Sequence, residues 1–175
     1  MAGKYLSPQQ FLKKFTENLA ILLPQKENLL VLAVSGGVDS VTMLTLFAEN
    51  YPKEKLIVAH VNHKFRADSD VDEEFVKSLA DKYGLKFVSK SLSPHKVGNL
   101  EDYFRDERHK FLNDTAKNYQ ADYIVLAHNA DDQAETILMN LVRGSGPSGL
   151  SGMKSSENLI IRPLLTFPKS ELINY

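Results

Sequence analysis

Short, continuously apolar runs alternate with longer segments of helical spacing along most of the chain. The apolar runs have the length of buried strands, and the segments between them carry apolar residues three and four positions apart. The predicted strands are 29–34, 56–61, 85–89 and 123–127, with a short run at 159–161. The predicted helices are 7–23, 38–50, 69–83, 100–119 and 131–142, and a last one begins near Pro168. This alternation predicts an α/β fold: a doubly wound, mostly parallel sheet with helices on both faces.

The helix predicted before Gly84 illustrates how the pattern selects an apolar face. Val71, Phe75, Val76 and Leu79 lie at helical spacing, so they are expected to pack together against the sheet. Gly84 follows them as the residue that ends the helix.

Ligands of such sheets bind at the carboxyl ends of the strands. The loops after Val34, Val61, Ser89 and Ala127 should therefore meet at one rim of the sheet, and we expect the functional residues there.

Composition and charge narrow the class of protein. The chain has 175 residues, of which 43% are hydrophobic and 25% charged, the balance of a globular protein of about one domain. No apolar run reaches membrane-spanning length and the start is not a secretory signal, so we expect a soluble, cytoplasmic protein. The absence of cysteine excludes disulfides, cysteine nucleophiles and cysteine-ligated iron–sulfur clusters. The formal net charge of −1 gives no reason to expect non-specific nucleic-acid binding.

The end of the sequence bears on domain organisation. The last predicted helix begins near Pro168 and meets no stop signal before Tyr175. We therefore expect residues 1–175 to form a single domain that is the N-terminal portion of a longer protein, with the C-terminal domains absent.

The strongest local signal is the hexapeptide Ser35-Gly36-Gly37-Val38-Asp39-Ser40, between a predicted strand and a predicted helix. Two glycines let the backbone turn sharply, so that successive N–H groups and the helix N-terminus face an anion, with serine hydroxyls beside them. Asp39 is a carboxylate in a place suited to phosphate, and a bridging Mg²⁺ would resolve that conflict. The simpler alternative is a tight turn with Asp39 in the first helical turn. The loop is not a Walker A motif, because no lysine follows its second glycine at the required spacing.

Two further polar segments are expected near this turn. The segment 60–66 ends the second predicted strand; His60 is either a partly buried histidine or part of a rim for a base or ribose, and Arg66 offers donors that match phosphate. On the helix 100–119, Arg105 and Arg108 share a face. Either they form salt bridges on the surface, or their guanidinium groups are directed at the site.

An acidic segment follows the fourth predicted strand. Asp131 and Asp132 begin a helix, where capping accounts for one of them. Asp132 and Glu135 are three residues apart, so they share a helical face at the rim and could hold Mg²⁺ or the ammonium group of an amine substrate. The glycine-rich segment 143–152 contains a G-x-G-x-x-G pattern. A dinucleotide-binding motif follows a strand, whereas this one follows a helix, so that function is not expected. We expect instead a flexible loop that could cover the site.

The hexapeptide resembles the SGGxDS motif of the PP-loop ATP pyrophosphatases, which cleave ATP between the α and β phosphates. The wider set of segments resembles the N-terminal catalytic domain of the tRNA(Ile)-lysidine synthetase family. The matching segments are 35–40, 60–66, the helix with Glu101, Arg105 and Arg108, 128–136, 143–153 and 162–165. Three positions depart from the family: Asn129 replaces a histidine, Phe104 an alanine and His109 a tyrosine.

The resemblance implies an adenine nucleotide alpha hydrolase-like fold and a two-step ligase reaction. ATP adenylates the wobble cytidine of tRNA(Ile) with a CAU anticodon, and L-lysine then displaces AMP to form lysidine. The implied catalytic residues are Asp39, Asp132, Glu135, Arg108 and His128, the last a candidate acceptor of the lysine proton. The implied ATP-binding residues are Ser35, Gly36, Gly37, Val38, Asp39, Ser40, His60 and Arg105. The implied magnesium ligands are Asp39 and Asp131.

Partners and rival functions follow from the same resemblance. The expected partners are tRNA(Ile) and L-lysine, and no association with a membrane is expected. The chain either acts alone or forms a homodimer. Because the charge is nearly balanced, much of the tRNA-binding surface is expected in the absent C-terminal part. The alternatives are another PP-loop tRNA-modifying enzyme such as a thiolase, an amidotransferase-type synthetase, and a noncatalytic adenine-nucleotide-binding module.

Overall fold

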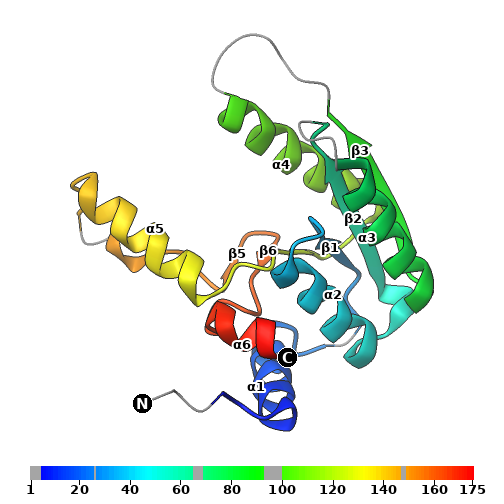
Figure 1. The fold of residues 1–175 in the computed structure, drawn as a ribbon, viewed down its shortest axis with the longest axis horizontal. Helices are drawn as coiled ribbons and strands as arrows, with labels where there is room; N and C mark the ends of the chain where they lie inside the picture. The colour runs from blue at the N-terminus through cyan, green and yellow to red at the C-terminus, as the bar shows by residue number, and fades with distance from the viewer. Residues whose placement is uncertain (1–4, 26, 65–68, 93–99, 147–148) are drawn as a thin grey trace.

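The computed structural model describes residues 5–25, 27–64, 69–92, 100–146 and 149–175. Six strands form one sheet in the order β3-β2-β1-β4-β6-β5 (Figure 1). Neighbouring strands are parallel except β5 and β6, which are antiparallel. The strands are β1 (Leu30–Ala33), β2 (Leu56–Asn62), β3 (Lys86–Ser91), β4 (Tyr123–Val125), β5 (Ser156–Glu157) and β6 (Ile160–Ile161). The predicted mostly parallel sheet is confirmed.

Helices follow the strands as the apolar pattern predicts. They are α1 (Pro8–Leu22), α2 (Val38–Asn50), α3 (Ser69–Tyr83), α4 (Leu100–Tyr119), α5 (Ala130–Val142) and α6 (Lys169–Asn174), with short 3₁₀ turns η1 (Lys53–Lys55) and η2 (Gly149–Ser151). The predicted bounds of α2, α3 and α4 are those observed. No helix in these described ranges is long and apolar enough to cross a membrane.

Two apolar clusters cover opposite faces of the sheet. The larger cluster joins one face to α1, α2, α3 and α6, and its fully buried members include Phe15, Phe47 and Leu32. The smaller cluster joins the other face to α4 through residues such as Leu112 and Ala116. Helices therefore lie on both sides, which is the doubly wound arrangement.

The apolar face predicted for α3 is only partly correct. Val76 is buried and Leu79 packs against the core, whereas Val71 is 65% exposed and Phe75 46% exposed. The buried stripe continues instead to Ala80. The four-residue spacing from Val76 to Ala80 follows the line along which α3 touches the sheet, and Val71 and Phe75 lie to one side of it.

α5 extends away from the sheet, as its yellow ribbon in Figure 1 shows, and none of its residues is buried. Its start nevertheless lies next to the centre of the sheet, because it follows β4. The strand order reverses between β1 and β4, and this switch point is where doubly wound sheets bind ligands. The turn after β1 and the start of α5 therefore flank the expected binding position.

Candidate functional site

The turn between β1 and α2 leaves the N-terminal end of helix α2 without a side-chain cap. Gly36 has φ of +92°, a conformation suited to glycine. Gly37 is the N-cap of α2 and provides no side-chain cap, so the first N–H groups of the helix are left for a ligand. Ser40 braces the turn: its hydroxyl accepts from the Ser35 N–H at 3.1 Å and donates to the Gly37 carbonyl at 2.9 Å. The local geometry has the form of a phosphate site.

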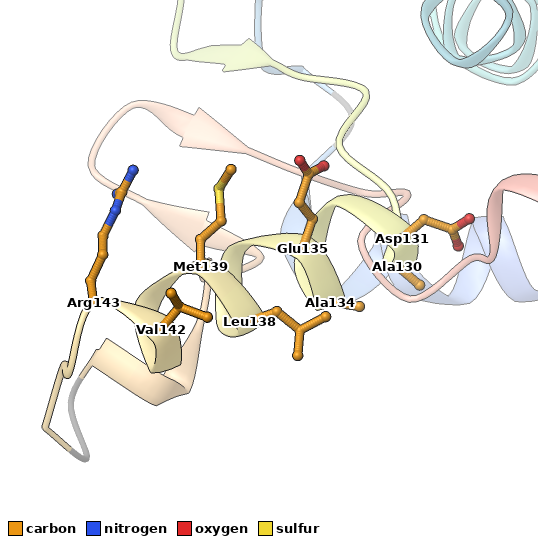
Figure 2. A pocket seen from close by; sticks show the side chains of 8 residues that line it. All are labelled: Ala130, Asp131, Ala134, Glu135, Leu138, Met139, Val142 and Arg143. Atoms are coloured by element: carbon orange, nitrogen blue, oxygen red, sulfur yellow. The ribbon is translucent and has the colours of Figure 1, made fainter.

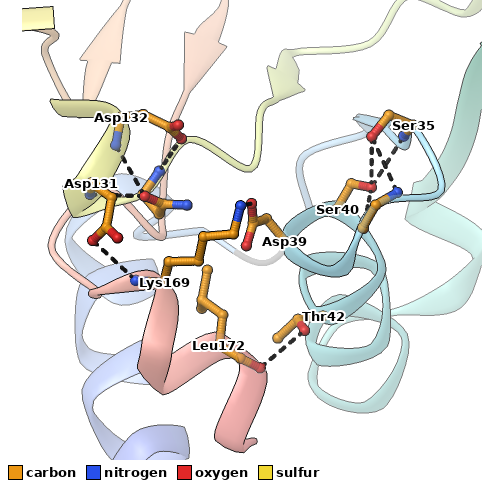
Figure 3. Close-up of polar contacts among 10 residues, drawn as sticks. Ser35, Asp39, Ser40, Thr42, Asp131, Asp132, Lys169 and Leu172 are labelled. Carbon is orange, nitrogen blue, oxygen red and sulfur yellow. Dashed lines mark hydrogen bonds and ion pairs between the residues drawn. The ribbon is translucent and has the colours of Figure 1, made fainter. Parts of the chain in front are cut away.

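Asp39 lies in the first turn of α2 and is incompletely paired. Its Oδ2 atom is 3.5 Å from the Nζ atom of Lys169, at the start of α6 (Figure 3). Its Oδ1 atom is buried and has no hydrogen-bond partner in the described part of the chain. A buried carboxylate oxygen without a partner costs free energy, so this atom is suited to a cation that arrives with a ligand.

A pocket of about 510 Å³ adjoins the turn. It is lined by residues from the turn, the end of β2, α3 and α4: Ser35, His60, Val61, Asn62, His63, Ser69, Asp72, Leu100, Glu101, Phe104, Arg105 and Arg108. The loops after β1 and β2 thus meet at one rim, as predicted; the loop after β3 lies mainly outside the described residues. Apolar walls beside cationic groups are suited to a nucleoside joined to phosphates.

The two arginines predicted from α4 both line this pocket. Arg105 Nη2 donates to Asp102 Oδ1 at 2.8 Å, between exposed side chains. Desolvation, and then the positive charge of Arg105, lower the pKa of Arg108. The pocket is also lined by the carboxylates of Asp72 and Glu101, so its lining is of mixed charge, and the two arginines are its groups suited to phosphate.

The histidines at the end of β2 differ in their surroundings. His60 is 2% exposed and its Nδ1 atom lies 2.8 Å from the Val34 carbonyl oxygen, so it fixes β2 beside the turn. His63 packs edge-on against Phe104 with ring centroids 5.0 Å apart, and its Nδ1 atom is buried without a hydrogen-bond partner in the described chain. Desolvation, Arg108 and His60 lower the pKa of His63. His63 therefore offers a neutral ring to a ligand; Arg66 lies outside the described residues.

Asn129 caps α5 on the opposite side of the switch point. It is fully buried, and its side chain accepts from the N–H groups of Asp131 at 2.8 Å and Asp132 at 3.1 Å. In return, Asp132 Oδ2 accepts from the Asn129 N–H at 2.9 Å. These contacts form a capping box. One oxygen of Asp132 is therefore used to start the helix, and Asn129 has a structural role of its own.

The acidic pair that shares a pocket is Asp131 and Glu135, rather than the predicted pair of Asp132 and Glu135. A shallow hollow of about 700 Å³ runs along α5 (Figure 2). Its lining residues are Ala130, Asp131, Ala134, Glu135, Leu138, Met139, Val142 and Arg143. Asp131 and Glu135 are four residues apart and so are neighbours on one side of the helix, while Asp132 is turned into the capping box with Asn129.

His128 is held by Arg162, whose role the sequence did not reveal. The Nε group of Arg162 donates to the His128 Nδ1 atom at 3.2 Å, and Arg162 is itself fixed by the Lys154 carbonyl. Burial and then Arg162 lower the pKa of His128, so its ring is neutral at pH 7. With Nδ1 accepting, the neutral ring carries its proton on Nε2. This geometry makes His128 a hydrogen-bond donor and disfavours the predicted role as a base.

The lowered pKa of His128 predicts a pH-dependent stability. The unfolded state binds more protons than the folded state below about pH 6.5, so the free energy of unfolding should fall as the pH is lowered through that value. Replacing His128 by Gln should reduce this fall without removing it, because His63 and His109 also have lowered pKa values. Urea unfolding of both proteins at pH 7.5 and 5.5 measures the difference. Equal losses in the two proteins would contradict the prediction.

The glycine-rich segment after α5 is partly tied down. The Gln133 side chain accepts from the Met153 N–H at 2.7 Å and donates to the Met153 carbonyl at 3.0 Å. These two bonds attach the end of the segment to α5. Residues 147–148 lie outside the described residues, so the expected covering role stays a prediction.

The contributors to the site that were missed from the sequence include Lys169, Arg162, His63, Phe104 and Asn129. Asn129 could have been found as an N-cap, since Asn with a carboxylate three residues later is a capping pattern. His63 lies in the segment 60–66, which the sequence had already placed near the glycine turn. Lys169 and Arg162 carry no local signal, because their partners are 130 and 34 residues away in the sequence.

Comparison with known proteins identifies relatives that match most of this chain. The sequence pattern of the PP-loop domain family matches residues 7–175. The tRNA(Ile)-lysidine synthase of Geobacter sulfurreducens is 45% identical over 154 residues, which are 83% of this chain and 33% of that protein. The corresponding synthase of Streptococcus gordonii is 41% identical over 171 residues, 93% of this chain and 38% of that protein. The chain thus spans about a third of the length of these curated relatives.

Solved structures share the fold at low sequence identity. The U34-tRNA thiolase NcsA of Methanococcus maripaludis, which is described with its [4Fe-4S] cluster, has a TM-score of 0.78 at 21% identity, with 95% of this chain and 62% of that chain covered. The NH3-dependent NAD synthetase of Campylobacter jejuni has a TM-score of 0.67 at 15% identity, with 97% and 72% covered. These likenesses confirm the expected fold and carry no information on the substrate.

Proposed function

The chain belongs to the PP-loop domain family, and from that premise we propose that it is the ATP-using catalytic portion of a cytoplasmic tRNA(Ile)-lysidine synthase. The observation that carries the proposal is the arrangement around the switch point: an uncapped glycine turn at the start of α2 on one side, and the acidic start of α5 on the other. Similarity to the curated synthases over most of this chain supports the choice of substrate.

The proposed reaction has two steps. In the first, O2 of the wobble cytidine attacks the α-phosphorus of ATP; an O–P bond forms, the bond between the α and β phosphates breaks, and pyrophosphate leaves. In the second, the ε-amine of L-lysine attacks C2 of the activated base; a C–N bond forms, the C–O bond breaks, and AMP leaves. The amine must lose protons in this step, so a nearby base is needed.

The glycine turn and its pocket suit the first step. The backbone N–H groups at the start of α2 would hold the leaving pyrophosphate, and Arg105 and Arg108, which line the adjoining pocket from α4, would contact the phosphates. His63 and Phe104 would contact the nucleoside, and His60 keeps β2 in register with the turn. Donors fixed before the reaction stabilise the charge that develops on a leaving group, which is commonly the largest catalytic contribution.

The donor set near the turn fits a magnesium ion. No group of three or more His, Cys, Asp or Glu side chains in the described ranges could hold a metal. Mg²⁺ in phosphate-transferring sites is commonly bound by one or two carboxylates together with substrate phosphates, which matches Asp39 with its unpaired Oδ1, assisted by Asp131. When bound, the ion neutralises charge on the phosphates.

The acidic start of α5 suits the second step. Asp131 and Glu135 present carboxylates to solvent along one side of the helix, and Asp132 keeps one oxygen beyond its capping bond. Carboxylates attract the lysine ammonium and can accept its proton. His128 would assist as a donor through Nε2, since its Nδ1 atom already accepts from Arg162.

Replacing Glu135 by Gln should separate the two steps. Glu135 is exposed and the substitution is nearly isosteric, so the fold and ATP cleavage should persist while lysine transfer falls about a hundredfold or more. Release of labelled pyrophosphate and incorporation of labelled lysine, followed in the same reaction, measure both steps. Glu74→Gln, at an exposed position on α3, is the matched control. Unchanged lysine transfer in the Glu135 variant would remove this residue from the mechanism.

Two alternatives are weaker. Thiolases that depend on a cysteine-ligated cluster need cysteines, and this chain has none. A noncatalytic nucleotide-binding module would use the glycine turn and leave the acidic start of α5 without a function.

The direct test supplies all proposed substrates. The purified protein is incubated with ATP, Mg²⁺, radiolabelled L-lysine and tRNA(Ile) with a CAU anticodon, and label in the tRNA is counted. We expect label that depends on ATP and on the cytidine in the wobble position. ATP cleavage to AMP without incorporation would favour another PP-loop enzyme, and binding without cleavage would favour the noncatalytic module. The net charge of −1 predicts a weak general affinity for RNA, and a homodimer stays a prediction.

A further inference from the structure

We propose that Lys169 is a positioning residue of the phosphate site: it holds Asp39 by one carboxylate oxygen and supplies the positive charge that the glycine turn lacks in its own sequence. The proposal rests on the ATP site of the proposed function. It goes beyond it, because Lys169 lies 130 residues from Asp39 in the sequence and outside the segments from which the site was predicted.

The contact between the two side chains is one-sided. The Lys169 ammonium lies 3.5 Å from Asp39 Oδ2, while Asp39 Oδ1 is buried with no partner among the described residues. Figure 3 shows the lysine reaching from α6 across to the first turn of α2. The ammonium thus fixes the orientation of the carboxylate and leaves the second oxygen available.

The backbone of Lys169 is held in place by the same neighbourhood. Its N–H donates to Asp131 Oδ1 at 3.2 Å, so Lys169 contacts both predicted magnesium ligands. One turn further along α6, Leu172 is 1% exposed, and its carbonyl accepts from the Thr42 hydroxyl of α2 at 3.4 Å. α6 is therefore packed on α2, and the reach of Lys169 to Asp39 is determined by the fold.

Stability does not explain the arrangement. The Lys169 side chain is 48% exposed, and ion pairs of such exposure contribute little to folding. A buried carboxylate oxygen without a partner is unfavourable until a ligand satisfies it. Phosphate-binding loops of the Walker type carry a lysine after their glycines, and this turn has none there. A lysine from α6 beside the carboxylate supplies an equivalent charge, and the negative phosphates allow it to share Asp39 with a divalent cation.

The test compares Lys169→Met with Lys169→Arg. Binding of Mn²⁺ with α,β-methylene-ATP is measured by calorimetry, and Mn²⁺ occupancy by electron paramagnetic resonance, so neither readout requires turnover. We expect the Met variant to bind about tenfold more weakly and the Arg variant to stay within about threefold of the original protein, because the charge is retained. Lys13→Met is the matched control, since Lys13 makes an exposed 3.9 Å ion pair with Glu17 on α1.

The outcomes are distinguishable. If Lys169→Met binds as tightly as the original protein, or if the Arg variant is as weak as the Met variant, the positioning role is wrong, whatever the thermal unfolding midpoints. If Lys13→Met weakens binding equally, the loss comes from the lower net positive charge of the protein in general, and the proposal is also wrong. If the unaltered protein does not bind the analogue, the ATP site itself fails, and with it the proposed function.

Discussion

Replacing Asp39 by Asn is expected to abolish AMP formation while the fold stays intact. Asparagine has nearly the same shape and can still lie in the first turn of α2, but it removes the negative charge. The unpartnered Oδ1 atom would no longer attract a divalent cation, and Lys169 would lose its ionic partner. We expect a decrease of at least about a hundredfold in AMP release, the size typical of losing one preorganised electrostatic contact.

Thin-layer separation of labelled AMP from labelled ATP, in the presence of tRNA, measures this decrease. Asp81→Asn is the matched control, since it removes the same charge from an exposed position on α3, nine residues beyond Asp72, which lies beside Gly36. Circular dichroism spectra and unfolding midpoints should be similar for all three proteins. AMP release near the original rate in the Asp39 variant would show that this carboxylate has no part in the reaction.

Replacing Gly36 by Ala should disable the phosphate site through the backbone. At φ of +92° an L-residue is strained whatever space surrounds it, at a cost of about 1–3 kcal/mol. The added Cβ would meet Asp72 and Val76 at ordinary contact distances of 3.5 and 3.6 Å, so the strain, and not a collision, is the cause. The turn should relax to a different conformation, and its N–H groups should then miss the phosphates. AMP release is expected to fall by more than about tenfold.

A second glycine separates strain from function. Gly84 has φ of +69° at the end of α3, and a Cβ there would meet nothing within 4 Å. Gly84→Ala should therefore lose a similar amount of stability and keep its activity. Chemical unfolding and AMP release, measured on both variants, give the comparison. Equal activities in the two variants would mean that the shape of the turn is not needed.

Much of the fold could be predicted because its signals are local. The apolar runs at 29–34 and 56–61 are buried strands, and the bounds of α2, α3 and α4 follow from the pattern between them. β5 could not be predicted, since two polar residues pair only because β6 lies beside them. The apolar face of α3 was misplaced, because the line of contact with the sheet depends on how the helix is packed.

The candidate site also has parts that could be predicted from the sequence and parts that could not. The glycine turn is contiguous in the sequence, and its geometry could be inferred from residues 35–40 alone. The contacts that tune it are not contiguous: Lys169 reaches Asp39 and Arg162 reaches His128 because α6 and β6 fold back beside the switch point. Such pairs become visible when the chain is folded, and the Arg162 contact is the reason that the proposed function assigns His128 the role of a donor and not that of a base.

The arrangement separates the two proposed steps in space. The phosphate turn and its pocket lie on the β1 and β2 side of the switch point, whereas the acidic start of α5 follows β4. Asp39 and Lys169 form the link between the two sides. An activated base placed over this link would be accessible to the phosphates from one side and to an amine from the other.

The most direct test of the account is a crystal structure of the protein with α,β-methylene-ATP and Mn²⁺, in which anomalous scattering locates the metal. We predict that the β and γ phosphates contact the N–H groups of residues 36–39, and that the manganese peak lies within coordination distance of Asp39 Oδ1. A glycine turn without phosphate, with the triphosphate bound elsewhere on the molecule, would contradict the central claim.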